Sequence, residues 1–326
     1  MRQKVLVCGA SGFMGRNIAA AFAALSEQYE VYSISKQEVV RLIGHPTAIT
    51  ADLTNPKHVA GLFASIKPDI VIQAAATTSG AKDIVERPYI HTTDNAVMNS
   101  LILRACYENN VRQFVFLSCG VMYQPGDELR REEDYNEHDE IFPAYFGVGW
   151  TKVYVEKMCE FYSRLGRTKH TVLRHSNTYG PWDKYDYEYS HVVGATIRKV
   201  MDAEEHGKIS VWGTGEETAR DLVYVRDVVR AVMLAVEKQK EAYLLCNIGA
   251  GIAITVRQIV ETIVRVSKKQ LEIVYDSSKP VIATRLALDY SKAYAYLGWA
   301  PRTSFETGIE TTLAWYRDEY QASLHQ

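Results

Sequence analysis

The fold is decided by the stretch Val5-Leu6-Val7-Cys8-Gly9-Ala10-Ser11-Gly12-Phe13-Met14-Gly15. It begins as a short apolar run, typical of a buried strand, and the residues from Gly15 to Ser26 follow a helical period. The three glycines have the spacing that allows a tight turn, close approach of the backbone to a pyrophosphate, and close helix–strand packing. Free N–H groups at a helix N-terminus favour anions. The stretch therefore predicts a dinucleotide site that includes Gly9, Ser11, Gly12, Phe13, Met14 and Gly15.

The same rhythm of strand and helix continues through the first two-thirds of the chain. Short runs rich in β-branched residues predict strands at Lys4–Cys8, Glu30–Ile34, Ile70–Gln73, Phe114–Leu117 and Thr171–Arg174. Helical periodicity predicts helices at Gly15–Ser26, His58–Ser65, Thr92–Glu108 and Thr151–Leu165. This alternation indicates an α/β fold with a Rossmann-type, doubly wound parallel sheet.

The rhythm changes after Tyr179-Gly180-Pro181, where a tyrosine-rich loop leads to a helix near His191–Asp202. We therefore expect a dinucleotide-binding domain at residues 1–180, with a returning segment near 220–248. The remainder, mainly residues 181–326, is expected to form a smaller mixed α/β substrate lobe. Such a lobe would close over the C-terminal ends of the strands, where open α/β sheets bind ligands.

Further cofactor contacts are expected where strands end. Small side chains after Gln73 would let the backbone approach the cofactor, and Ala51-Asp52-Leu53 resembles a pair that holds an adenine ring. A histidine at the end of a later strand should lie near the nicotinamide amide. The residues concerned are Asp52, Leu53, Ala74, Ala75, Ala76 and His175.

The end of the second strand bears on the choice between NAD and NADP. A carboxylate there would bond the ribose 2′-hydroxyl and repel a 2′-phosphate. The chain reads Val31-Tyr32-Ser33-Ile34-Ser35-Lys36, with no carboxylate before Glu38. Ser35 and Lys36 could bind a phosphate, although Lys36 could instead be a solvated turn lysine. The pattern favours NADP over NAD.

Composition excludes several other classes. The net charge of −2 over 326 residues provides no field for nucleic acid or anionic membranes. Five cysteines stand singly, which is typical of reduced thiols in a cytoplasmic protein rather than of disulfides or a metal site. The first residues run directly into a strand, so we expect no signal peptide. No stretch approaches the ~20 apolar residues that span a bilayer.

Several motifs together carry a family resemblance over nearly the whole length. They are Ala74–Gly80, Asn177–Pro181, Ser190–Val192, Val211–Gly215, Arg220–Val228, Asn247–Gly251 and Leu297–Trp299. With the glycine stretch, they resemble the extended short-chain dehydrogenases/reductases, and within that family the GDP-L-fucose synthases. The resemblance implies epimerisation at two carbons of a GDP-4-keto-6-deoxy sugar and NADP-dependent reduction of its ketone. It also implies a Ser/Thr–Tyr–Lys triad, in which the lysine holds the nicotinamide ribose and lowers the tyrosine pKa.

Carried over residue by residue, this triad is incomplete. Lys152 matches the lysine, but Val148 stands four residues earlier, where the tyrosine belongs, and valine transfers no proton. Counting back from Tyr123 places Cys119 on the triad serine, whereas a slip of one residue would place Ser118 there. The same count puts Val121 on the epimerising cysteine. Other candidates for proton transfer are Tyr145, His175, Tyr185, Tyr187, Tyr189, His191 and Cys119.

The substrate side of the resemblance is better preserved. His191 matches the epimerising histidine, and Arg220 matches an arginine that holds the diphosphate. Lys199 replaces a second such arginine, Arg285 lies near a further basic contact, and Asn177 is expected to hold substrate. These matches predict a nucleotide-sugar ligand.

The leading hypothesis is therefore an NAD(P)-dependent oxidoreductase acting at C4 of a nucleotide-activated sugar, with GDP as the favoured nucleotide and an atypical proton-transfer site. The alternatives are an epimerase or dehydratase that retains its cofactor, and a non-catalytic protein that binds cofactor or sugar nucleotide. Gly120 and Val121 stand where a 4,6-dehydratase needs an acid–base pair, which argues against that reaction. The resemblance also implies a homodimer through helices Thr92–Glu108 and Thr151–Leu165, although apolar residues such as Val97, Leu101, Val155 and Met158 could equally be core.

Overall fold

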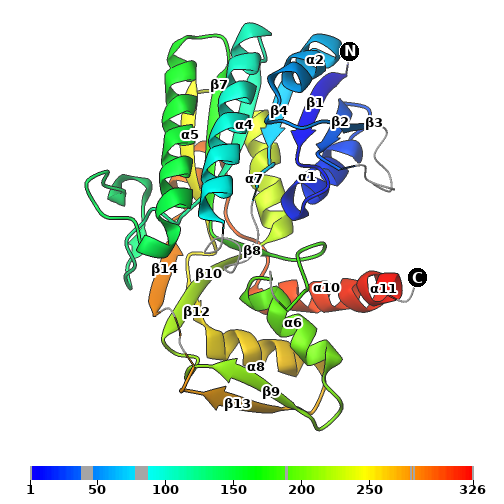
Figure 1. Cartoon of the computed structure of the whole chain (residues 1–326), viewed down its shortest axis with the longest axis vertical. Coiled ribbons are helices and arrows are strands. Elements are labelled where there is room, and N and C mark those ends of the chain that lie inside the picture. Colours follow the sequence, from blue (N-terminus) through cyan, green and yellow to red (C-terminus); the bar gives the residue numbers. More distant parts are fainter. Residues whose placement is uncertain are drawn as a thin grey trace.

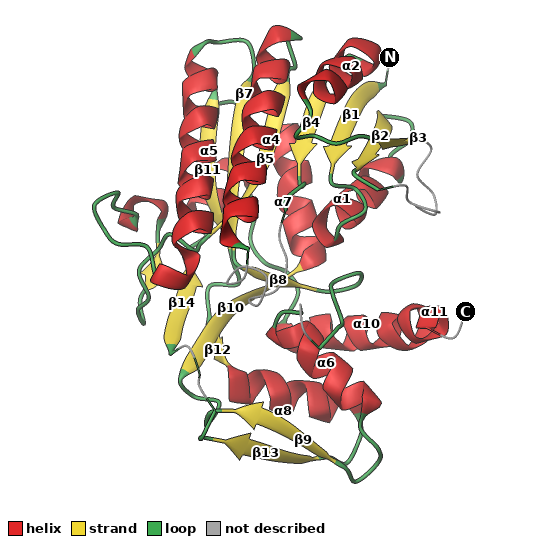
Figure 2. Ribbon diagram, in the orientation of Figure 1, coloured by secondary structure: helices red, strands yellow, loops and turns green. Residues whose placement is uncertain are grey.

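A seven-stranded parallel sheet forms the first lobe of the molecule, which we describe from a computed structural model (Figures 1 and 2). The structure describes residues 2–37, 47–77, 87–187, 190–279, 281 and 283–324. The strand order is β11-β7-β5-β4-β1-β2-β3, with its reversal between β1 and β4. The strands are β1 Gln3–Cys8, β2 Tyr29–Ser35, β3 Thr47–Thr50, β4 Ile70–Gln73, β5 Gln113–Cys119, β7 Lys169–His175 and β11 Tyr243–Ile248.

Helices cover both faces of this sheet, which confirms the predicted doubly wound fold. Residues on alternate positions of β1 show why: Val5 and Val7 pack on one face with α1 and α7, whereas Leu6 and Cys8 pack on the other with α2, α4 and α5. Successive strand residues point to opposite faces, so a strand buried on both faces is apolar at every position. The helices are α1 Phe13–Ala23, α2 Pro56–Ile66, α4 Pro88–Glu108, α5 Phe146–Arg164 and α7 Val225–Lys238.

The second lobe lies beyond the C-terminal ends of the parallel strands (Figure 1). Its main sheet has the order β12-β10-β14-β6, β8 also pairs with β10, and β13 pairs with β9. The strands are β6 Leu129–Arg130, β8 Asn177–Tyr179, β9 Lys208–Trp212, β10 Thr218–Tyr224, β12 Ala253–Thr255, β13 Glu272–Asp276 and β14 Thr284–Leu288. The helices are α6 Val192–Asp202, α8 Val256–Ser267, α10 Phe305–Trp315 and α11 Gln321–Leu324, whereas α9 Ser291–Leu297 packs against α7 and β11 of the first lobe. Three short segments are η1 Glu132–Asp134, η2 Pro143–Tyr145 and the π-helical η3 Tyr316–Tyr320.

One buried carboxylate joins the strands of this lobe. Asp221 on β10 accepts hydrogen bonds from the backbone N–H groups of Ala250 and Leu288 at 2.7 and 3.0 Å, and from the Ser176 hydroxyl at 2.9 Å. A buried charge is tolerated when such donors surround it. Its neighbour Arg220 is therefore held on a fixed strand. Within the described residues, no helix is long and apolar enough to cross a membrane.

Candidate active site

The glycine loop has the geometry that a dinucleotide pyrophosphate requires. Gly9 has φ +77°, and a Cβ there would lie 2.5 Å from the Ala75 Cα, while one on Gly15 would lie 2.1 Å from the Gly9 oxygen. Both positions therefore accept only glycine. Gly12 is the N-cap of α1, and neither a side-chain cap nor an acidic residue occupies the first turn. The free N–H groups of α1 are thus available to an anion, so these residues fit the phosphates of a dinucleotide.

The end of β2 presents a charge pair rather than a free cation. Lys36 Nζ lies 3.2 Å from an Asp52 carboxylate oxygen. Asp52 also accepts the N–H and hydroxyl of Thr54 at 2.9 and 2.7 Å, and these bonds, ahead of the lysine, lower its pKa. Ser35 is buried and donates its hydroxyl to the Gln37 carbonyl at 2.7 Å. The structure therefore brings Lys36 and Asp52 together but commits the Ser35 hydroxyl to the backbone.

The remaining predicted cofactor residues lie along the edges of this site. Ala74 and Ala75 follow β4, with the Ala74 N–H bonded to the Cys8 carbonyl at 3.2 Å, which holds this turn against the glycine loop. Ala76 is exposed, whereas Leu53 is buried in the core beside β3. The backbone of Ala74 and Ala75 thus lies directly against Gly9 of the glycine loop.

Lys152 is held on α5 above the end of β5. Its Nζ donates to the Leu117 carbonyl at 2.8 Å and lies 4.7 Å from the centre of the Phe116 ring. Burial lowers the pKa of Lys152, whereas Cys119 and Glu156 act in the opposite direction. Val148, one helical turn earlier, lines a cavity of about 20 Å³ together with Lys152. The site thus retains the lysine and has an apolar side chain where a tyrosine was expected.

The structure also separates Ser118 from Cys119. The Ser118 side chain is fully buried and donates to Glu156 Oε1 at 2.6 Å. Cys119 is the next residue, so its side chain leaves the opposite face of β5, where it is partly exposed and acts on Lys152. Ser118 is thus committed to Glu156, whereas Cys119 is free of that bond, and the prediction that Cys119 stands in place of the triad serine remains a prediction. The other cysteines are buried, and burial raises the pKa of each.

Two histidines follow along the chain, and the pKa of each is lowered. His175 is paired with Cys119 across β7 and β5, and burial lowers its pKa to about 4, with Lys152 and His191 adding to the effect. Its Nδ1 lies 2.8 Å from the Ser176 carbonyl, which only accepts, so Nδ1 carries the proton. Nε2 is therefore an acceptor. His191 is the N-cap of α6, and its pKa is lowered by burial first, then by Lys184 and Arg220.

The second lobe carries the basic residues that the sequence assigned to the substrate. Arg220 on β10 lies close enough to His191 to affect its pKa, and within the described residues it has no carboxylate partner. Lys199 on α6 donates to the Ser210 carbonyl at 3.2 Å. Asn177 is exposed at the start of β8, and its amide reaches the Asp221 carbonyl at 3.3 Å. The structure thus places Arg220 beside His191, while Lys199 contacts β9 and Asn177 lies at the start of β8.

Arg285 does not join this group. β10 and β14 are parallel, with Ala219 opposite Arg285 and Arg220 opposite Leu286. Residues that face each other across parallel strands point to the same side, so Arg220 and Arg285 leave opposite faces of the sheet. Arg285 instead pairs with Asp127 at 3.1 Å. The sequence placed both arginines near the substrate because spacing alone does not reveal the face of a strand.

The tyrosine candidates are also divided by their contacts. Tyr185 is buried in an aromatic cluster and donates to the Gly180 carbonyl at 2.8 Å. Tyr187 donates to Asp202 at 2.7 Å, away from Lys152. Tyr145 packs beside Met122 and neighbouring apolar residues at the start of α5. Tyr189 lies outside the described residues. None of the described tyrosines is brought to Lys152.

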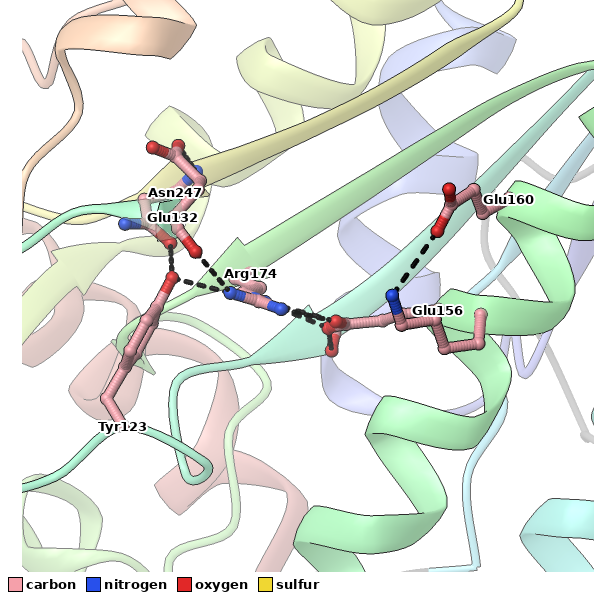
Figure 3. Close-up of polar contacts among 8 residues, drawn as sticks. Tyr123, Glu132, Glu156, Glu160, Arg174 and Asn247 are labelled. Carbon is pink, nitrogen blue, oxygen red and sulfur yellow. Dashed lines mark hydrogen bonds and ion pairs between the residues drawn. The ribbon is translucent and has the colours of Figure 1, made fainter. Parts of the chain in front are cut away.

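A buried ionic network, which the sequence did not predict, supports the site (Figure 3). Arg174 on β7 pairs with Glu156 on α5 at 2.6 Å, and both side chains are 4% exposed. Arg174 also donates to the Tyr123 hydroxyl at 2.7 Å, and Tyr123 donates to Asn247 at 2.9 Å. The signal was the arginine that directly follows Val172 and Leu173 in a predicted strand, because a charge buried in a strand of the sheet needs a buried partner.

Each arm of this network adjoins one residue of the site. Ser118 precedes Cys119, Arg174 precedes His175, and Glu156 follows Lys152 by one helical turn. Because Glu156 accepts from both Arg174 and Ser118, it ties α5 to β5 and β7 at this level. The network therefore fixes the relative positions of the three elements that carry Cys119, Lys152 and His175.

Together, a glycine loop at a helix N-terminus, a lysine above the sheet and cations in the second lobe define a Rossmann-type protein with a dinucleotide site. The model of the family described as "NAD dependent epimerase/dehydratase family" matches residues 5–249. The chain belongs to this family of NAD(P)-binding enzymes.

Relatives of known activity extend over the whole chain. It is 27% identical to GDP-L-colitose synthase of Yersinia pseudotuberculosis over 319 residues, which cover 97% of this chain and 98% of that relative. It is 29% identical to GDP-L-fucose synthase of Sinorhizobium fredii, with coverage of 94% and 93%. These relatives confirm the family resemblance found in the sequence.

Solved structures agree on the architecture. UDP-glucose 4-epimerase of Thermotoga maritima with UDP-glucose has a TM-score of 0.84 and 28% identity, covering 98% of this chain and 100% of that chain. The UDP-glucose 4-epimerase of Thermus thermophilus in complex with NAD has a TM-score of 0.81 and 25% identity, covering 97% and 100%. The fold is thus that of nucleotide-sugar epimerases.

Proposed function

We propose that this protein is an NAD(P)-dependent oxidoreductase that acts at C4 of a GDP-linked sugar. The observation that carries the proposal is that His175 lies near both Lys152 of the first lobe and His191, while His191 in turn lies near Arg220 of the second lobe. The similarity to GDP-L-colitose synthase and GDP-L-fucose synthase supports a GDP-linked ligand.

The chain's own residues have distinct roles in this proposal. The N–H groups of α1 bind the cofactor pyrophosphate, and Lys152 binds one hydroxyl of the nicotinamide ribose. Arg220 and Lys199 bind the diphosphate of the substrate, while Asn177 and His191 contact its sugar. The bound nicotinamide would supply or accept hydride. His175 Nε2 accepts a hydrogen bond from the nicotinamide amide, since Nδ1 is committed to the Ser176 carbonyl.

The cofactor is proposed to be NADP in preference to NAD. The support is the absence of a carboxylate at Ser33–Gln37 and the presence of Lys36 at the end of β2. A 2′-phosphate would have to compete with Asp52 for this lysine, because the two are already paired.

A second candidate is a 4-epimerase that retains its cofactor through the reaction. The similarity to two UDP-glucose 4-epimerase structures favours it. A non-catalytic binding protein is favoured only by Val148 and Cys119. Lys152 argues against a non-catalytic protein, because desolvating an ammonium group is costly and a scaffold has no need of that group.

A homodimer through α4 and α5 is also part of the proposal. These helices lie side by side on the outside of the sheet (Figure 1). Their outward residues Val97, Tyr154 and Phe161 are 40%, 42% and 52% exposed, an apolar surface of the kind that marks interfaces. Val155, in contrast, is 1% exposed and belongs to the core. Free cysteines throughout the described residues are consistent with a cytoplasmic dimer.

The test is incubation of the protein with 4-deuterated NADPH or NADH and a panel of 4-keto nucleotide sugars, followed by mass spectrometry of the products. Deuterium in a GDP-linked sugar is the expected result. An isomerised sugar without deuterium would identify the retained-cofactor epimerase instead. Unchanged sugars with bound, unreacted cofactor would overturn both enzymatic candidates.

A further inference from the structure

A small cavity adjoins the position of the missing tyrosine. It lies between α4, α5 and the ends of β4 and β5, and its volume is about 20 Å³. A water molecule needs roughly 10–15 Å³ of such space and two to four polar partners. The walls provide both polar and apolar groups: Ala75, Asn95, Asn99, Phe116, Val148, Thr151, Lys152 and Val155. The cavity therefore has the size and chemistry for one water molecule.

The hydrogen bonds of Lys152 point to the same conclusion. An ammonium has three N–H donors, and within the described residues only the Leu117 carbonyl accepts one of them. The Phe116 ring lies beneath the charge but accepts no conventional hydrogen bond. Because an unsatisfied buried donor is costly, the two remaining donors require partners. A water molecule in the cavity would supply one of them.

The small side chain of Val148 leaves room for a water molecule in the cavity beside Lys152. The side chain is apolar and short, and it lines the cavity one helical turn before Lys152. Thr151 and Asn99 bring further polar atoms, although the Thr151 hydroxyl already donates to the Gly147 carbonyl at 2.7 Å and can only accept a bond from water. Water held here would have Lys152 Nζ as its charged partner.

Building on the proposed oxidoreductase function, we propose that a water molecule bound in this cavity to Lys152 replaces the tyrosine hydroxyl, with Lys152 as the acid. In reduction, hydride from a reduced nicotinamide cofactor adds to the carbonyl carbon, and the carbonyl π pair moves to oxygen. The oxygen takes a proton from the water, which takes one from the Lys152 ammonium. The neutral amine is then reprotonated from solvent. Oxidation follows the same path in reverse.

Other nearby groups are less suited to this proton transfer. His175 is neutral at pH 7 and its only proton, on Nδ1, is bonded to the Ser176 carbonyl, so it has none to donate. Burial lowers the pKa of Lys152, which makes its proton easier to release. A general acid is most effective when its pKa is close to the working pH.

Filling the cavity tests the proposal, with Val148→Leu as the main variant. Val153→Leu is the matched control, because it makes the same substitution on the same helix in a residue that packs against Tyr123 and Leu288, away from the cavity. We expect Val148→Leu to lower kcat by about 10²-fold or more, the contribution of one general acid, with an unchanged Kd for cofactor. Wild-type kcat in Val148→Leu would overturn the proposal. A similar loss of kcat in both variants would mean that altered packing causes the effect, and this result would also count against the proposal.

Two further measurements do not depend on turnover. A high-resolution crystal structure of the wild-type protein with NADP should show a water molecule about 3 Å from Lys152 Nζ. NMR titration of ¹⁵N-labelled lysine should show a pKa for Lys152 below that of the exposed lysines, and Val148→Leu should shift its signal. A crystal structure without this water refutes the proposal. Failure of wild-type protein to reduce any nucleotide sugar refutes the proposed function instead, and the crystal structure still decides the water site.

Discussion

Breaking the buried pair between Arg174 and Glu156 should be the most damaging single change near the site. Glu156→Gln leaves the Arg174 guanidinium, which is 4% exposed, without a counter-charge. Removing one partner of a buried ion pair typically costs about 3–5 kcal/mol, because the other charge remains desolvated. Glutamine keeps the shape and one acceptor for Ser118, so we expect a loss of about 3 kcal/mol in the free energy of unfolding, at the lower end of that range.

Urea denaturation of wild type, Glu156→Gln, Arg174→Met and the double variant Glu156→Leu/Arg174→Met measures this loss. The double variant should recover most of the stability, since replacing both charges by apolar groups is often nearly neutral. NMR of labelled lysine should also show a changed environment for Lys152 in the single variants. A loss below about 1 kcal/mol in Glu156→Gln, or a double variant as unstable as the sum of the singles, would refute the reasoning.

Three further predictions concern charge. Arg220→Met should weaken GDP-sugar binding by about 10–100-fold, as expected for a lost charged contact of about 1.5–3 kcal/mol, without changing cofactor affinity, as titration calorimetry would show. Lys36→Ala should weaken NADPH binding more than NADH binding, while Asp52→Asn should favour NADPH by freeing the lysine; equal effects on both cofactors would contradict an NADP site at Lys36. Burial raises the pKa of Asp183 from 3.8 to about 7, so the folded state binds more protons than the unfolded state and stability declines as pH rises between about 4 and 7. Asp183→Asn should reduce this decline in urea melts at several pH values, and an unchanged pH dependence would exclude Asp183 as its source.

Local sequence was sufficient for the backbone of the cofactor site. Gly9 and Gly15 are required by contacts with residues that adjoin them in the strand–turn–helix unit, so their spacing already identifies the turn. The alternation of apolar runs and helical stretches likewise predicted the doubly wound sheet. Apolar residues are spaced differently in a buried strand and in an amphipathic helix, so their spacing shows which element each segment forms. The places of Lys152 and Val148 were identified from the family resemblance, whose motif puts a tyrosine four residues before the lysine.

Side-chain direction was decided only in the tertiary structure. Ser118 and Cys119 differ by one residue, yet one bonds Glu156 in the interior and the other leaves the opposite face of β5, because a shift of one residue along a strand reverses the face. The same alternation separates Arg285 from Arg220. Neither the register between strands nor the choice of face is encoded within a few neighbouring residues.

The long-range partners were equally beyond the sequence. Glu156 and Arg174 are 18 positions apart and meet only because α5 packs over β7. Lys36 and Asp52 meet because β2 and β3 are neighbours in the sheet. The sequence thus determined which cofactor fold the chain adopts and that its usual tyrosine is missing. Packing of distant elements determined what surrounds Val148 and Lys152, because desolvation and hydrogen bonding there depend on every element that packs around these two residues.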